Sequence, residues 1–120
     1  MTSPMPLVDC IAELLYRVPE LQSAYYEHLR DFDELLPHVF LGEVTRCVVQ
    51  QVRSAEIAEA LPARRTLDFF EEYMAGGGRE VQQLIAVSFV ENLAKHDDIL
   101  ATLSTIIGPH LRAELGKHSQ

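Results

Sequence analysis

The segment from residue 79 to residue 95 constrains the fold most, because as a helix it is apolar around nearly its whole circumference. At about 100° per residue, its apolar side chains point in almost every direction. They are Val81, Leu84, Ile85, Ala86, Val87, Phe89, Val90 and Leu93. A helix of this kind is stable in water only when other elements cover it. The segment therefore predicts a largely buried central helix near 79–95.

Helical periodicity also runs through most of the remaining chain, and no stretch shows a sustained strand-like alternation. Proline and glycine separate the expected helices, at Pro6, Pro19, Pro37, Pro62, Gly76-Gly77-Gly78 and Gly108-Pro109. Asp97 or Asp98 is expected to cap the helix that follows it. The pattern predicts an all-α fold, a compact bundle of six to seven short helices that forms a single domain over residues 1–120.

The chain is acidic, with ten Lys and Arg against eighteen Asp and Glu, a net charge of −8. Such a chain repels phosphate backbones and attracts a basic protein, so we expect a basic protein partner and no nucleic acid. The first residues lack a basic stretch and contain Asp9 and Glu13, which predicts no signal peptide and no membrane association. The two cysteines, Cys10 and Cys47, lie among apolar residues, as buried thiols of a cytoplasmic protein do.

No residue set matches a catalytic, cofactor-binding or metal-binding motif, so we expect no enzyme, no cofactor and no metal. His110, Glu114 and His118 share a helical face, but the face spans about 12 Å, which is too long for one zinc ion. Ser88 lies in mid-helix, with no histidine evident beside it. The glycine triplet lacks the pattern of a phosphate-binding loop.

Two groups of residues remain as candidate sites. Ser88, Glu91 and Asn92 form a polar seam at i, i+3 and i+4 on the central helix. A buried carboxylate there must be paired, hydrogen-bonded or protonated. The seam is therefore a ligand pocket, a structural network bonded to a neighbouring helix or arginine, or a face that reaches solvent.

The second group is an acidic corner between two expected helices. It combines negative charge with an aromatic anchor, and its residues are Asp31, Asp33, Glu34, Phe40 and Glu43. An apolar anchor rimmed by acids fits the capture of a basic protein. A solvated corner above core residues is the alternative.

Two phrases, LLPHVFLGEVTRCVV at 35–49 and LDFFEEYMAGGGREVQQLIAVSFVENL at 67–93, resemble a family of small, acidic, all-helical bacterial proteins of unknown function. Some members of this family are associated with polymorphic toxin and immunity loci. Cys47 stands where the family pattern has Trp. The resemblance implies a bacterial cytoplasmic protein of the immunity type and no catalytic residue.

We therefore expect a non-enzymatic protein-binding module, an immunity protein that occludes a toxin. Two other functions stay open. One is a small-ligand binder or hydrolase that uses the polar seam. The other is a self-associating scaffold, such as a homodimer, with Phe69 and Tyr73 or Val49 and Val90 as its apolar surface.

Overall fold

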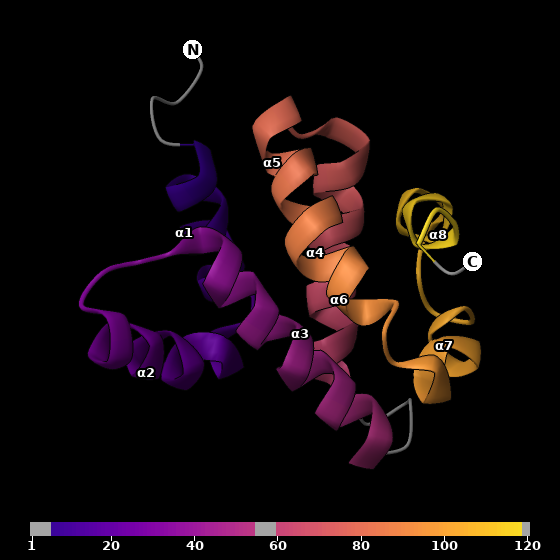
Figure 1. Ribbon diagram of the computed structural model, residues 1–120, viewed down its shortest axis with the longest axis horizontal. Coiled ribbons are helices and arrows are strands. Elements are labelled where there is room, and N and C mark those ends of the chain that lie inside the picture. Colours follow the sequence, from indigo (N-terminus) through magenta and orange to yellow (C-terminus); the bar gives the residue numbers. More distant parts are fainter. Residues whose placement is uncertain (1–5, 55–59, 119–120) are drawn as a thin grey trace.

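The computed structural model describes residues 6–54 and 60–118, and within them every regular element is a helix (Figure 1). The elements are α1 (Pro6–Arg17), the short 3-10 turn η1 (Pro19–Leu21), α2 (Gln22–Phe32), α3 (Pro37–Ser54), α4 (Leu61–Gly76), α5 (Arg79–Ile85), the π-helical turn η2 (Ala86–Val90), α6 (Glu91–Leu93), α7 (Asp97–Leu103) and α8 (Pro109–Gly116). The predicted all-α bundle is confirmed. No described helix is long and apolar enough to cross a bilayer.

The predicted central helix is formed by α5, η2 and α6 in one continuous run (Figure 1). The backbone stays helical at both joins, with φ −61° and ψ −46° at Ala86 and φ −61° and ψ −42° at Glu91. It packs against α1, α3, α4 and α8. Buried Leu84, Ile85 and Phe89, each at most 1% exposed, show why the segment needed cover on several sides.

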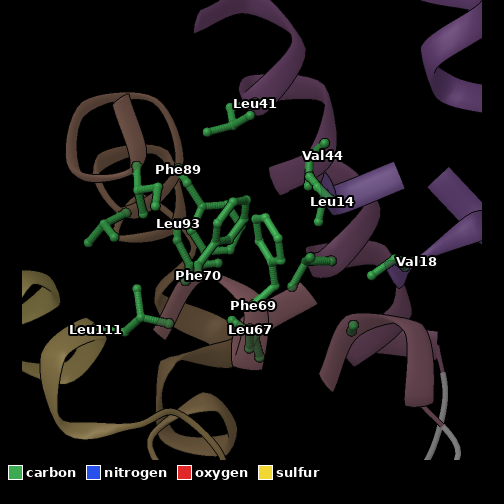
Figure 2. Packing of buried hydrophobic residues seen from close by; sticks show 14 of the residues in the cluster. Leu14, Val18, Leu41, Val44, Leu67, Phe69, Phe70, Phe89, Leu93 and Leu111 are labelled. Carbon is green, nitrogen blue, oxygen red and sulfur yellow. The ribbon is translucent and has the colours of Figure 1, made fainter. Parts of the chain in front are cut away.

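Three phenylalanine rings lie together at the centre of the core (Figure 2). Phe69 and Phe70 come from α4 and Phe89 from η2, and all three side chains are 0% exposed. The ring centroids of Phe70 and Phe89 are 4.4 Å apart, and those of Phe69 and Phe70 are 5.6 Å apart. Leu14 of α1 and Leu111 of α8 are also buried in this cluster. Burying each ring contributes roughly 1.5–3 kcal/mol. Because the rings come from α4 and η2, their contacts also connect parts of the chain that are far apart in sequence.

Two carboxylates join the last two helices to the rest of the bundle. Asp98 accepts hydrogen bonds from Arg53 Nε at 2.6 Å and Nη2 at 2.9 Å, which connects α7 to α3. The predicted capping role of Asp97 or Asp98 is wrong, because the cap position is His96 and no side chain caps α7. The hydrogen bonds from Arg53 instead lower the pKa of Asp98.

The side chain of Glu71, on α4, caps the N-terminus of α8. Its carboxylate accepts the backbone N–H groups of Leu111 at 2.9 Å and His110 at 3.1 Å, and it contacts His110 Nδ1 at 2.5 Å. A Cβ on Gly108 would lie 2.4 Å from Glu71 Cδ, so glycine allows this approach. His110 is thus paired with Glu71, whereas Glu114 lies 3.6 Å from His118.

Candidate functional site

A buried histidine holds the connection between α2 and α3 in place. His28 is 1% exposed; its Nδ1 lies 2.9 Å from Glu43 Oε1, and its Nε2 lies 3.0 Å from the backbone nitrogen of Leu36. A backbone N–H can only donate, so Nε2 accepts and Nδ1 carries the proton that it donates to Glu43. One side chain therefore ties together α2, the residues 33–36 and α3.

The role of His28 was missed in the sequence, although a signal for it was present. Leu21, Tyr25, His28 and Phe32 are spaced i, i+4, i+7 and i+11, so the histidine continues an apolar helical stripe. A polar residue in such a stripe is expected to be buried and hydrogen-bonded.

Phe40 does not serve as the predicted surface anchor, because it is 0% exposed. Its ring centroid lies 5.6 Å from that of Tyr25 and 5.5 Å from that of His28. The helical period of α3 turns Phe40 inward together with Leu41 and Val44. Phe32, at the end of α2, and Val39, at the start of α3, are apolar side chains that are about two-fifths exposed.

The four acids of the predicted corner surround this connection. Asp31, Asp33 and Glu34 are exposed, and Glu43 is half-buried beside His28. Asp33 ends α2 in the left-handed conformation at φ 63°, and its N–H donates to Leu29 O at 2.8 Å. We call these four residues the acidic corner. The connection that carries two of them lies at one end of the long axis, opposite α7 and α8 (Figure 1).

A groove of about 270 Å³ runs between α2 and α3, beside the acidic corner. Both helices line it with the same i, i+3, i+4, i+7 spacing. The lining residues are Ala24, Glu27, His28 and Asp31 of α2 and Glu43, Arg46, Cys47 and Gln50 of α3. This groove is thus lined by three carboxylates and one guanidinium.

A second groove, of about 330 Å³, lies between η1, α3 and α4. It shares Cys47 and Gln50 with the first groove, so the two adjoin along α3. Its other lining residues are Glu20, Leu21, Val48, Gln51, Ser54, Pro62, Ala63 and Thr66. Gln51 Oε1 accepts the N–H of Ala63 at 2.7 Å, which fixes the start of α4 against α3.

The polar seam is only partly formed. The Asn92 side-chain amide donates to the carbonyl of Ser88 at 2.8 Å, and the Ser88 hydroxyl lies 2.5 Å from Nδ1 of His38 on α3. Thr45 Oγ1 also lies 3.5 Å from the Ser88 carbonyl. The contact with His38 joins residues fifty positions apart, so no local pattern could have indicated it.

Glu91 is exposed, so the seam reaches solvent at this residue, which is one of the alternatives that the sequence left open. The exposed residues Gln83, Val87 and Glu91 are four positions apart, so Glu91 continues the exposed stripe of this helix. Neither groove along α3 is lined by any of the three seam residues.

The apolar surfaces proposed for self-association are mostly interior. Phe69, Val49 and Val90 are at most 3% exposed, and the half-buried Tyr73 stacks on Phe69 with ring centroids 4.5 Å apart. These residues therefore stabilise the core and do not form the expected scaffold surface.

The fold and the site define an all-helical protein with an acidic corner beside a polar groove. A family model for a domain of unknown function, DUF7674, matches residues 11–120. The chain belongs to this family, and the expected membership in a family of unknown function is confirmed. No curated protein and no solved structure matches the chain.

Proposed function

We propose that the protein is a non-enzymatic binding module that captures a basic protein at the acidic corner. The observation that carries the proposal is the concentration of four carboxylates on the end of α2, the connection 33–36 and the start of α3, where Glu43 lies 2.9 Å from the buried His28. Arg30 and Arg46 lie near these acids. Arg30 is exposed and 3.6 Å from Asp31, a geometry that water and salt screen strongly, and Arg46 lines the adjacent groove.

The corner is suited to fast and specific association. Its negative field steers a basic partner toward it, and the His28 bonds hold the two helices in one arrangement before binding. Exposed Phe32 and Val39 supply apolar area beside the charges, so they take the anchor role first assigned to Phe40.

The finer proposal is an immunity protein that occludes a toxin in the bacterial cytoplasm. It is supported by the resemblance at residues 35–49 and 67–93. An occluding inhibitor needs a surface that complements its target and needs no catalytic group, which is consistent with the corner described above.

The test begins with capture of the tagged protein's partner from its native lysate and continues with association rates of the purified pair. Asp31→Asn, Asp33→Asn and Glu34→Gln together should slow association by about tenfold or more and flatten its salt dependence. The matched control is Asp68→Asn, Glu80→Gln and Glu91→Gln, which removes the same charge from exposed positions on α4, α5 and α6. Equal slowing by both triple variants would show that the corner is the wrong surface.

A serine hydrolase is the second candidate, and the contact between Ser88 and His38 is the observation that favours it. A histidine within hydrogen-bond reach is the first requirement of an activated serine. Fluorophosphonate labelling of the wild-type protein tests it. Labelling that disappears in both Ser88→Ala and His38→Ala, with helical content unchanged, would replace the binding module by a hydrolase.

A further inference from the structure

We infer that the basic partner inserts a short peptide segment into the two adjoining grooves along α3, with an arginine or lysine at the Glu43 end and a small apolar side chain at the Ala63 end. The inference rests on the proposed function and names the chemistry of the partner. We call the two grooves together the α3 groove.

The α3 groove has the length of a short peptide. It follows α3 from Glu43 to Ser54, which is about 16 Å at about 1.5 Å per residue. From Glu43 to Gln51 the distance along the helix is about 12 Å, which an extended chain covers in about four residues. A segment lying in it therefore presents a side chain to each end.

The chemistry of the α3 groove changes along its length. At one end Glu27, Asp31 and Glu43 outnumber Arg46, so the charge is negative. At the other end Leu21, Val48 and Ala63 are apolar. Glu20 also lines that end, but its carboxylate is 2.5 Å from Arg65 Nη2, and that hydrogen bond lowers the pKa of Glu20. The groove thus complements a cation at one end and an apolar group at the other.

The acids at the charged end of the α3 groove are available to bind a cationic group of the ligand. His28 is neutral in its bond to Glu43, so it leaves the negative charge of that carboxylate uncompensated. Glu27 forms no ion pair with another residue in the described part of the chain. Guanidinium and ammonium groups are the donors that match such carboxylates.

Cys47 lies where the two grooves meet, so its thiol reports whether the α3 groove is occupied. It is half-buried, whereas Cys10 is 2% exposed and thus shielded from reagents. Burial is the main cause that raises the pKa of Cys47, so alkylation is slow enough to be followed at mildly alkaline pH.

The experiment measures the alkylation rate of Cys47 by iodoacetamide at low salt, read by mass spectrometry. The probe is a capped heptapeptide of glycine and alanine with arginine second and valine sixth. At a free peptide concentration of about twice the Kd, the peptide should slow the alkylation of Cys47 about threefold. Analogues with citrulline for arginine or serine for valine should protect less. Failure of the arginine–valine peptide to protect at about 10 mM, or equal protection by spermidine, would overturn the inference.

Two double variants test where on the protein the peptide binds when it protects Cys47. Glu27→Gln with Glu43→Gln should abolish protection, because an amide at position 43 keeps an oxygen for His28 but removes the charge. Glu80→Gln with Glu91→Gln removes the same charge from exposed positions on α5 and α6 and should leave protection intact. Equal loss of protection in the two doubles would overturn the α3 groove as the site.

The purified partner separates this inference from the proposed function. A partner that requires the acidic corner but leaves Cys47 alkylation unchanged would overturn the α3 groove and leave the binding module standing. Peptide protection without any corner-dependent partner would overturn the acidic corner as the capture surface and leave the α3 groove only as a site that binds a basic peptide.

Discussion

At the residue scale, His28 shows how a polar side chain becomes part of a core. Both ring nitrogens have partners, Glu43 and the N–H of Leu36, and the ring lies 4.9 Å from that of Phe32. A buried polar group without partners costs about 1–3 kcal/mol. No buried side-chain nitrogen or oxygen in the described residues is left without a hydrogen bond. His28 is thus stabilising, and it also shapes the acidic corner.

Substitutions at Asp33 test how the left-handed conformation at the end of α2 affects stability. A side chain with a Cβ is strained at φ 63°, and glycine is not. Aspartate adopts this conformation more readily than alanine, because its short polar side chain can hydrogen-bond to nearby backbone. We expect Asp33→Ala to lower the free energy of unfolding by about 1 kcal/mol and Asp33→Gly to leave it unchanged or raise it, measured by urea denaturation. Asp31→Ala, on the exposed face of α2, is the control and should change it by less than about 0.5 kcal/mol. Equal destabilisation by alanine and glycine at position 33 would contradict this explanation.

Glu71 makes stability depend on pH. Burial alone would raise its pKa, but hydrogen bonds from Leu111 and His110 outweigh burial and lower the pKa below its ordinary value of 4.5. A carboxyl whose pKa is lower in the folded state stabilises the protein above pH 4.5, and that stability is lost as the pH falls through the folded-state pKa.

We therefore expect Glu71→Gln to be less stable than the wild type at pH 7 and the difference to shrink progressively below pH 4.5. Thermal unfolding followed by circular dichroism across this range measures it. A difference that stays constant down to the lowest pH at which the protein folds would show that the charge of Glu71 does not stabilise α8.

At the element scale, the π-helical turn η2 lies in the middle of the central helix. Within this turn Val87 is 46% exposed, while Phe89 and Val90 stay buried. A π-helical turn takes up one more residue than an α-helical turn, so η2 accommodates one additional residue within an otherwise regular helix.

A one-residue deletion distinguishes this turn from the rest of the helix. Deleting Val87 removes the extra residue, so the flanking segments keep their faces in a regular α-helix. Deleting Gln83, which is exposed on α5, rotates everything beyond it by about 100°. We expect the Val87 deletion to fold and the Gln83 deletion not to fold, as judged by cooperative thermal unfolding. Equal loss of folding in both would contradict the role given to η2.

At the scale of the whole molecule, the phenylalanine cluster connects α4 and η2, and the surrounding core reaches α1 and α8 (Figure 2). The chain is therefore expected to unfold as one unit, as the single-domain prediction requires. The far-UV signal of the helices and the near-UV signal of Tyr25 and Tyr73 should change in the same transition. Two separated transitions would contradict a single domain.

The cluster also predicts the cost of a cavity. Phe89→Ala should lower the free energy of unfolding by about 3–5 kcal/mol, because it removes a fully buried ring. Val87→Ala, an exposed change on the same turn, should cost less than about 1 kcal/mol. Denaturant titration of both variants measures the difference, and similar losses would place the centre of the core elsewhere.

The properties that depend on neighbouring residues could be predicted from the sequence. Helical period, proline and glycine breaks, a helix apolar on all sides and a net charge of −8 are local or additive, so they predicted the all-α bundle, the central helix and the acidic corner.

The tertiary structure alone decided which distant groups meet. It brought His38 to Ser88, placed Glu71 at the start of α8 and joined Asp98 to Arg53. Each of these contacts depends on how helices far apart in the chain pack. Helical period carries no information about such packing, because it describes the face of one helix and not the neighbour that covers it.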